Sequence, residues 1–173
     1  MSSRNTFVRS MHDLGLATWF GGSLMGAVGL NGATAQAHDS SERLRLSSLG
    51  WARWTPVTIA AVGAHAIGSL GLIAGNSNRL AHQDEARSNT KVKTVLTVAA
   101  AGVSLYSGLL GAKIAKHANE GGHGVTEPAA SASDELESVQ RQQKALQWVI
   151  PALTGVLVIL GAQQGEQQRP QVR

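Results

Sequence analysis

The sequence predicts an all-α protein, a bundle of four transmembrane helices in up-down order. Charged residues make up 15% of the 173 residues, well below the roughly 25% that is usual in soluble domains. Four windows contain no Asp, Glu, Lys or Arg, namely 14–37, 54–78, 94–112 and 145–165. Each is close to the roughly 20 residues that a helix needs to cross a bilayer. Soluble helices need a charged outer face, so the windows favour a membrane protein over a soluble bundle.

The first span is expected over residues 13–34. Small residues and one tryptophan follow each other there at steps of four, three, four and three: Gly15, Trp19, Gly22, Gly26 and Gly29. These steps put them on one helical face, where small residues let a neighbouring helix approach closely. A cleaved signal peptide is the alternative, because Arg4 and Arg9 precede the apolar stretch and A-x-A sites follow it at 33–37.

The second and third spans are expected over 55–76 and 92–115. Glycines at helical spacing predict a packing face on each, Gly68 and Gly71 on the second and Gly108 and Gly111 on the third. The stretch 36–54 is expected to be a connection with a turn or two of amphipathic helix. Pro56 is expected in the first turn of the second span, where its missing N–H costs nothing. Residues 79–93 form a polar, charged connection.

The fourth span is expected over 146–163, at the end of a longer helix. A polar loop, 117–133, precedes it, and Ser133 is suited to cap a helix whose first turn begins with Asp134 and Glu135. This helix would start in water and enter the bilayer near Trp148, an interfacial residue type. Residues 164–173 form a polar tail.

Four spans place both termini on one side of the membrane. The Lys and Arg residues of the connections nearly balance between the two sides, so the positive-inside rule does not orient the chain. We expect cytoplasmic termini in a bacterial plasma membrane, because no translocation signal precedes the first span.

Several chemistries are excluded by composition. The chain has no cysteine, which excludes disulfides, thiolate catalysis and Cys-based metal sites. It has no P-loop, dinucleotide-binding glycine run, G-x-S-x-G or H-E-x-x-H motif. Its net charge of +4 is dispersed and no basic patch interleaves with aromatic residues, so nucleic-acid binding is not expected. We expect no enzymatic activity and no cofactor.

His65 is the strongest candidate for chemistry, because it is the ionisable residue of the second charge-free window and such groups are costly inside a membrane. It can be a neutral histidine bonded to a neighbouring helix, near Tyr106, a metal ligand, or a proton or substrate contact. His12, at the start of the first span, can be an interfacial cap or a metal ligand, with Met11 and Met25 as soft partners for copper.

A haem shared by the two histidines is not expected. His12 lies at the edge of its span, whereas His65 lies about ten residues into its own helix, roughly 15 Å at the α-helical rise. In the polar loop, His117, His123 and Glu120 are expected to be solvated, with a surface metal as the alternative. His38 and His82 are isolated.

The stretch His12-Asp-Leu-Gly15-Leu-Ala-Thr-Trp19-Phe-Gly21-Gly22 resembles the first helix of the copper-resistance D (CopD) domain family, which opens with H-x-x-x-x-x-x-W-x-G-G. The resemblance covers residues 12–22 and carries over His12, Trp19, Gly21 and Gly22. It implies a bundle of membrane helices in a bacterial inner membrane. Copper-handling members use clusters of His and Met, whereas this chain has three Met, so the resemblance implies the fold more than copper transport.

The function expected from the sequence is a structural or accessory role. The chain would pack in the lipid bilayer against copies of itself or against the subunits of a larger membrane complex. The alternative is a transporter or metal-handling protein that uses His65 and His12.

Overall fold

The computed structural model describes residues 5–77 and 84–166. The expected polar tail beyond residue 166, the first part of the 79–93 connection with His82, and Arg4 lie outside the described residues. The described chain is helical and contains no strand, which confirms the all-α prediction. Its helices are α1 (Thr6–Met25), a π-helical turn (Gly26–Leu30), α2 (Asn31–Thr34), α3 (Ser40–Gly75), α5 (Asp84–Lys116), a short 3-10 helix (Ala118–Glu120) and α6 (Asp134–Glu166).

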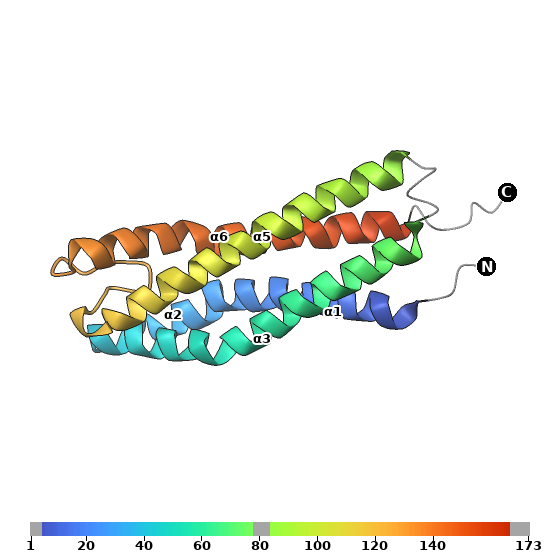
Figure 1. Cartoon of the computed structure of the whole chain (residues 1–173). Helices are drawn as coiled ribbons and strands as arrows, with labels where there is room; N and C mark the ends of the chain where they lie inside the picture. The colour runs from blue at the N-terminus through green and yellow to red at the C-terminus, as the bar shows by residue number, and fades with distance from the viewer. Residues whose placement is uncertain (1–4, 78–83, 167–173) are drawn as a thin grey trace.

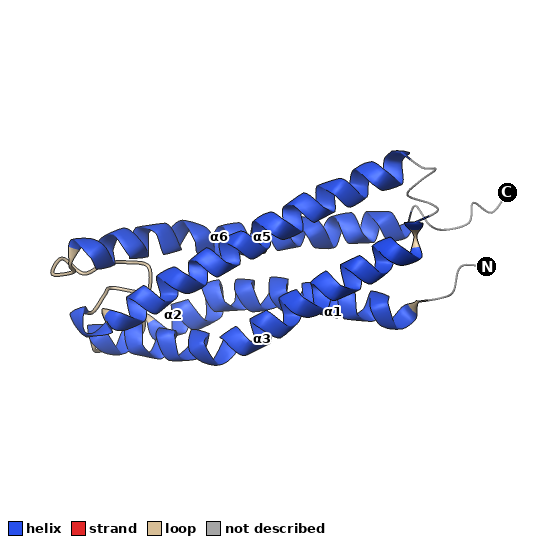
Figure 2. Ribbon diagram, in the orientation of Figure 1, coloured by secondary structure: helices blue, strands red, loops and turns tan. Residues whose placement is uncertain are grey.

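The helices lie lengthwise along one another, and each long helix runs opposite to the one before it (Figure 1). The start of α1 and the end of α6 lie at one end of the molecule, and the loop between α5 and α6 lies at the other. Figure 2 shows how little of the described chain lies outside helices. α1 packs mainly against α3, α5 packs mainly against α6, and α1 also packs against α6, whereas α3 and α5 meet over a shorter length.

Two helices begin earlier than the sequence predicted. α3 begins at Ser40, not near residue 55, because the Asp39 carboxylate accepts hydrogen bonds from the N–H groups of Ser41 and Glu42, at 2.8 and 2.9 Å. This N-cap satisfies donors that the first turn would leave unpaired. Pro56 therefore lies inside α3 and not in its first turn. α5 begins at Asp84, within the expected polar connection.

The start of α6 agrees with the sequence. The helix begins at Asp134, and the Ser133 hydroxyl accepts a hydrogen bond from the N–H of Leu136 at 3.3 Å. The acidic first turn complements the positive end of the helix dipole. This cap is the one that the sequence predicted.

Three helical segments of the described chain are long and apolar enough to cross a membrane, Ser40–Gly75, Arg87–Lys116 and Asp134–Gly165. The segment expected as the first span is not among them. Its helix changes to π-helical hydrogen bonding at Gly26 and resumes as α2 at Asn31. Glycine contributes little apolar surface, so a glycine-rich helix is less hydrophobic than its freedom from charge suggests.

The interior is divided into two clusters of buried apolar side chains. One lies near the α5–α6 loop and is formed by Leu44, Leu110, Ile114, Ala118, Leu136 and Val139. The other lies further along the bundle and is formed by Trp19, Ala61, Ala100 and Ile150. Between them, the Asn31 side chain joins three helices, because it accepts hydrogen bonds from Ser47 and Trp51 and donates one to Gln147.

The loop between α5 and α6 is held against the bundle by hydrogen bonds. The buried Gln140 amide donates to the carbonyls of Gly124 and Val125, at 3.2 and 3.0 Å. Gly121 has a φ of +76°, and a Cβ there would collide with the Ser40 side chain. The loop therefore needs glycine at this position both for its conformation and for its approach to α3.

The Glu120 carboxylate fastens the two ends of this loop. It accepts hydrogen bonds from the N–H of Ser133 at 2.7 Å and from Nδ1 of His117 at 2.6 Å. These bonds favour the ionised form and lower the pKa of Glu120 from 4.5 to about 2. The carboxylate thus stabilises the loop fully above pH 4.5, and this stabilisation is lost as the pH falls from 4.5 towards 2.

We expect acid to open this loop before it unfolds the helices. Amide hydrogen exchange at Ser133, corrected for the intrinsic rate, should be faster at about pH 3 than at about pH 6. In the Glu120→Gln variant, the Ser133 amide should exchange rapidly at both pH values. The side-chain amide has a single oxygen and cannot accept from both Ser133 and His117 as the two carboxylate oxygens do. Equal protection of Ser133 at the two pH values in the unaltered chain would contradict this role of Glu120.

Candidate functional site

The site begins with a close crossing of α1 and α3. A Cβ at Gly15 would lie 2.5 Å from the carbonyl oxygen of Ala61 and 2.6 Å from the backbone nitrogen of His65. A Cβ at Gly68 would lie 2.6 Å from the backbone nitrogen of His12. Real Cβ atoms do not come so close to backbone, so the crossing requires glycine at both positions. The two backbones therefore meet without a layer of side chains between them.

This crossing brings His12 and His65 together. Their ring centroids are 4.4 Å apart, and both side chains are buried, with 4% and 1% of their surface exposed. Nδ1 of His65 lies 3.2 Å from the carbonyl oxygen of His12, and Nε2 lies 3.3 Å from the Thr97 hydroxyl. A carbonyl oxygen can only accept, so Nδ1 carries the proton. In the neutral ring, Nε2 then accepts from Thr97.

The expectation that the two histidines lie far apart is wrong. It treated His12 as the edge of a span that begins at residue 13, whereas α1 begins at Thr6 and carries His12 nearly two turns into the bundle. α1 and α3 run in opposite directions, so the early part of α1 meets the late part of α3. The hydrogen-bonded interpretation of His65 fits the geometry, with Thr97 as its partner. Tyr106 pairs with Gln142 instead.

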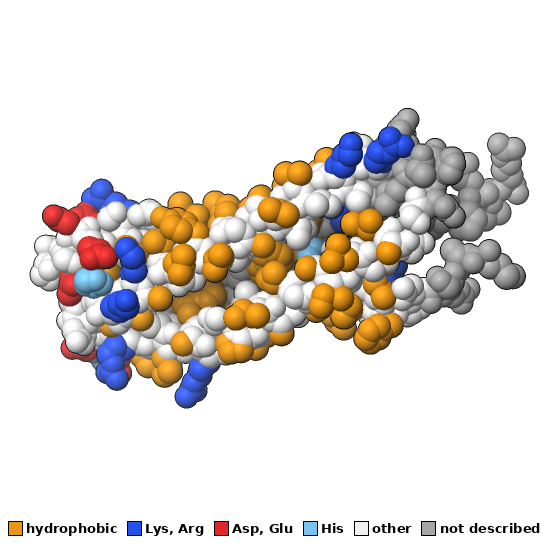
Figure 3. Space-filling model, in the orientation of Figure 1, with side chains coloured by type: hydrophobic (Ala, Val, Ile, Leu, Met, Phe, Trp, Pro, Cys, Tyr) orange, Lys and Arg blue, Asp and Glu red, His pale blue; other side chains and the backbone are white. Residues whose placement is uncertain are grey.

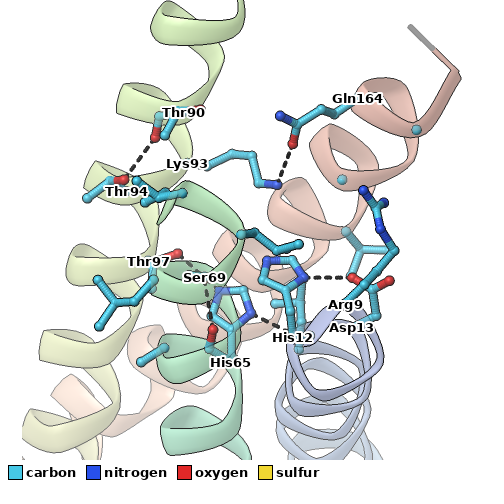
Figure 4. A pocket seen from close by; sticks show the side chains of 18 of the residues that line it. Arg9, His12, Asp13, His65, Ser69, Thr90, Lys93, Thr94, Thr97 and Gln164 are labelled. Atoms are coloured by element: carbon cyan, nitrogen blue, oxygen red, sulfur yellow. Dashed lines mark hydrogen bonds and ion pairs between the residues drawn. The ribbon is translucent and has the colours of Figure 1, made fainter. Parts of the chain in front are cut away.

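The histidine pair forms the floor of a vestibule of about 580 Å³ between α1, α3, α5 and α6. In Figure 4, Lys93 reaches into this space from α5, and its ammonium donates a hydrogen bond to the Gln164 side chain on α6 at 3.0 Å. Asp13 and Arg9 lie on the α1 side. The Asp13 carboxylate accepts from Nδ1 of His12 at 2.6 Å. Apolar side chains form much of the remaining wall, namely Leu16, Leu70, Ile73, Val98 and Val158.

Among the described residues, His12 and His65 have no third His, Asp or Glu side chain beside them to complete a group of metal ligands. Within residues 5–77 and 84–166, no three His, Asp or Glu side chains are placed to hold an ion together. Both ring nitrogens of His65 are engaged in hydrogen bonds, and Nδ1 of His12 is bonded to Asp13. His12 therefore has one ring nitrogen, Nε2, available towards the vestibule. The described side chains of the site offer hydrogen-bonding groups and a positive charge.

Sequence reasoning missed Lys93, because this residue falls where the charged connection 79–93 passes into the expected span 92–115, and no role was assigned to it. The available signal was helical spacing. Thr90, Lys93, Thr94 and Thr97 recur at steps of three, one and three, so they share one helical face, and all four line the vestibule. A polar face that continues from a charged segment into a charge-free one indicates a polar space inside the bundle.

The predicted packing glycines divide into two groups. Beside Gly15 and Gly68, three others are covered by side chains of the neighbouring helix: the Trp54 ring lies over Gly22, the Trp51 ring over Gly26, and Val8 over Gly71. At the remaining positions no other helix is in contact. A Cβ at Gly29 would meet only Met25 of its own segment, and a Cβ at Gly108 or Gly111 would meet no described atom within 4 Å.

The other candidate ligands lie away from the vestibule. His117 and Glu120 take part in the loop contacts, while His123 is exposed. Met25 is 65% exposed and, like Met11, is not among the residues that line the vestibule. Neither methionine therefore contributes to the lining around His12 and His65.

No model of a known protein family, no curated protein and no solved structure matches this chain. The resemblance of residues 12–22 to the CopD family stays a prediction.

Proposed function

We propose that this chain is a small multi-pass protein of a plasma membrane, an up-down bundle of four spanning helices with cytoplasmic termini. Its role is accessory and not enzymatic, and it associates with itself or with a larger membrane complex. The observation that carries this proposal is a belt of exposed apolar side chains around the middle of the bundle. Figure 3 shows these side chains over the central part of one face, with charged groups gathered towards the ends.

The belt consists of residues that a soluble protein would bury. Large apolar side chains of α3, α5 and α6 that are more than half exposed include Ile59, Ile67, Leu70, Val95, Val98, Leu105, Leu109 and Ile159. Contiguous exposed apolar surface of this kind indicates contact with lipid or with another protein. Because the exposed apolar side chains come from three helices, lipid hydrocarbon, which surrounds a membrane protein on all sides, accounts for them better than a single partner surface.

The bundle is longer than a bilayer is thick. α3 has 36 residues, about 54 Å at the helical rise, whereas the hydrocarbon core measures about 30 Å. The part of the bundle that exceeds the hydrocarbon thickness corresponds to the end that carries the α5–α6 loop, where charged residues and the Leu44 cluster are found. We infer that this end stands in water, with Trp51, Trp54 and Trp148 near the interface.

The open glycines of α5 support an accessory role. Gly108 and Gly111 leave a strip of backbone uncovered by the rest of the described chain, and small residues on a membrane helix are where another helix packs closely. The metal-handling alternative has less support, because no third His, Asp or Glu among the described residues joins the two histidines.

Membrane spanning can be tested with single cysteines, because the chain has none of its own. Ser77→Cys lies two residues beyond the end of α3, and Ala129→Cys lies in the α5–α6 loop at the opposite end of the bundle. In intact cells, a membrane-impermeant maleimide should label Ala129→Cys and leave Ser77→Cys unlabelled until the membrane is opened. Labelling of both in intact cells, or release of the unaltered chain by an alkaline wash, would contradict the proposal.

The accessory role is tested by purification in a mild detergent, with mass spectrometry of proteins and metals. We expect a stoichiometric partner or a homo-oligomer without bound metal. An assembly that carries stoichiometric copper, iron or zinc would favour the metal-handling alternative.

A further inference from the structure

We propose that the vestibule binds an anionic amphiphile, with its acidic head group at the Lys93 ammonium and its apolar chain along the vestibule wall. The inference goes beyond the accessory role, and it rests on the proposed membrane location only for the supply of the ligand. It is carried by the charge, the open hydrogen-bonding atoms and the apolar walls of one cavity.

The charge in the vestibule favours an anion. Lys93 is half-buried, and its partner there, Gln164, is neutral. No carboxylate of the described side chains lies within ion-pair distance of it, and the Asp13 carboxylate is engaged by His12. An ammonium has three donors, so an acidic group can bind it without displacing Gln164. Arg9 adds a second cation to the lining.

A second polar contact is available on the floor. Nδ1 of His12 donates to Asp13, so Nε2 of the neutral ring is an acceptor. No described group bonds to this nitrogen, although the side chain lines the vestibule. A head group that keeps one proton, such as a phosphate monoester, could use both contacts, whereas a carboxylate would use Lys93 alone. Both share the chemistry that the site selects, an anion on an apolar chain.

The walls suit the apolar part of such a molecule. Leu16, Leu70, Ile73, Val98 and Val158 come from the four helices that surround the vestibule. The volume of about 580 Å³ lies within the range of roughly 300–1,000 Å³ typical of small-molecule sites. A fully polar anion would leave these walls in contact with water, so the ligand is expected to be amphiphilic.

The test is photocrosslinking of the full chain in vesicles of zwitterionic lipid. Three probes carry a diazirine on the same ten-carbon chain and differ in the head group, which is a carboxylate, a phosphate or a neutral alcohol. We expect the acidic probes to label vestibule peptides of α3, α5 or α6. Lys93→Gln should lower that labelling about ten- to hundredfold, the size expected for a lost charge-assisted hydrogen bond. The ratio of carboxylate to phosphate labelling identifies the head group.

Lys91→Gln is the matched control, because Lys91 is exposed on the same helix, carries the same charge and does not line the vestibule. The Lys91→Gln variant should be labelled as strongly as the unaltered chain, and the Lys93→Arg variant should keep most of the labelling. Competition on the unaltered chain needs no variant: decanoate or decyl phosphate should displace the probes, and decanol should not. Equal labelling by the alcohol, insensitivity to Lys93→Gln in a folded variant, or no labelling of vestibule peptides would overturn the proposal. If the chain resists the alkaline wash but gives one of these labelling results, the membrane location stands and only the ligand site is contradicted.

Discussion

In the purified monomer, Gly15→Ala and Gly68→Ala should destabilise the chain, while Gly108→Ala and Gly111→Ala should stabilise it. A methyl group at either of the first two positions would lie 2.5–2.6 Å from backbone atoms of the facing helix. Backbone cannot move aside as a flexible side chain can, so α1 and α3 would have to separate. Forced overpacking of this kind costs about 1–3 kcal/mol, and occasionally more.

The two α5 variants are the matched control, since the chemical change is identical. No described atom lies within 4 Å of their new methyl groups. Alanine inside a helix is better than glycine by roughly 0.5–1 kcal/mol, so the sign of the effect should reverse. The free energy of unfolding can be measured in mixed micelles by titration with a denaturing detergent. Equal effects at all four positions would mean that α1 and α3 do not cross at Gly15 and Gly68.

Leu44→Ala should lower the free energy of unfolding by about 2–5 kcal/mol, the range for a fully buried leucine. The Leu44 side chain is 0% exposed and contributes to the apolar cluster near the loop end. If this end stands in water, the loss includes both the transfer of the leucine from water and the cavity that is left. Thermal melting in a neutral detergent gives the difference between the two chains.

Leu49→Ala is the comparison, because Leu49 lies on the same helix and is 50% exposed. It should change the stability by no more than about 0.5 kcal/mol. If the two variants melt at the same temperature, the buried cluster does not stabilise the loop end, and the helix extension from Ser40 would have to be held by its N-cap alone.

The sequence predicted the helical class and the start of α6, because freedom from charge and a Ser-Asp-Glu cap are local signals. It did not predict where α3 begins. A charge-free window indicates the part of a helix that can lie in hydrocarbon, whereas α3 begins about four turns earlier, in the charged segment 40–53. That segment is helical because Asp39 caps it and Leu44 is buried by residues distant in the chain.

The candidate site was harder to predict, because it depends on register between helices. Helical spacing places Gly15 and Gly68 on packing faces but does not say that Gly68 meets His12. That pairing decides whether His12 and His65 are neighbours. Asn31 is a similar case: it is a polar residue in an apolar window, and its partners Ser47, Trp51 and Gln147 can be identified only once three helices are in place.

The uneven packing of the helices has a mechanical consequence. α1 with α3 and α5 with α6 are two closely packed hairpins, joined mainly through α1 and α6 and less through α3 and α5. A small rotation of one hairpin about the α1–α6 contact would increase the separation of α3 and α5 and leave the packing within each hairpin unchanged. His65 on α3 and Lys93 on α5 belong to different hairpins, so such a rotation would change the distance between them and the width of the vestibule.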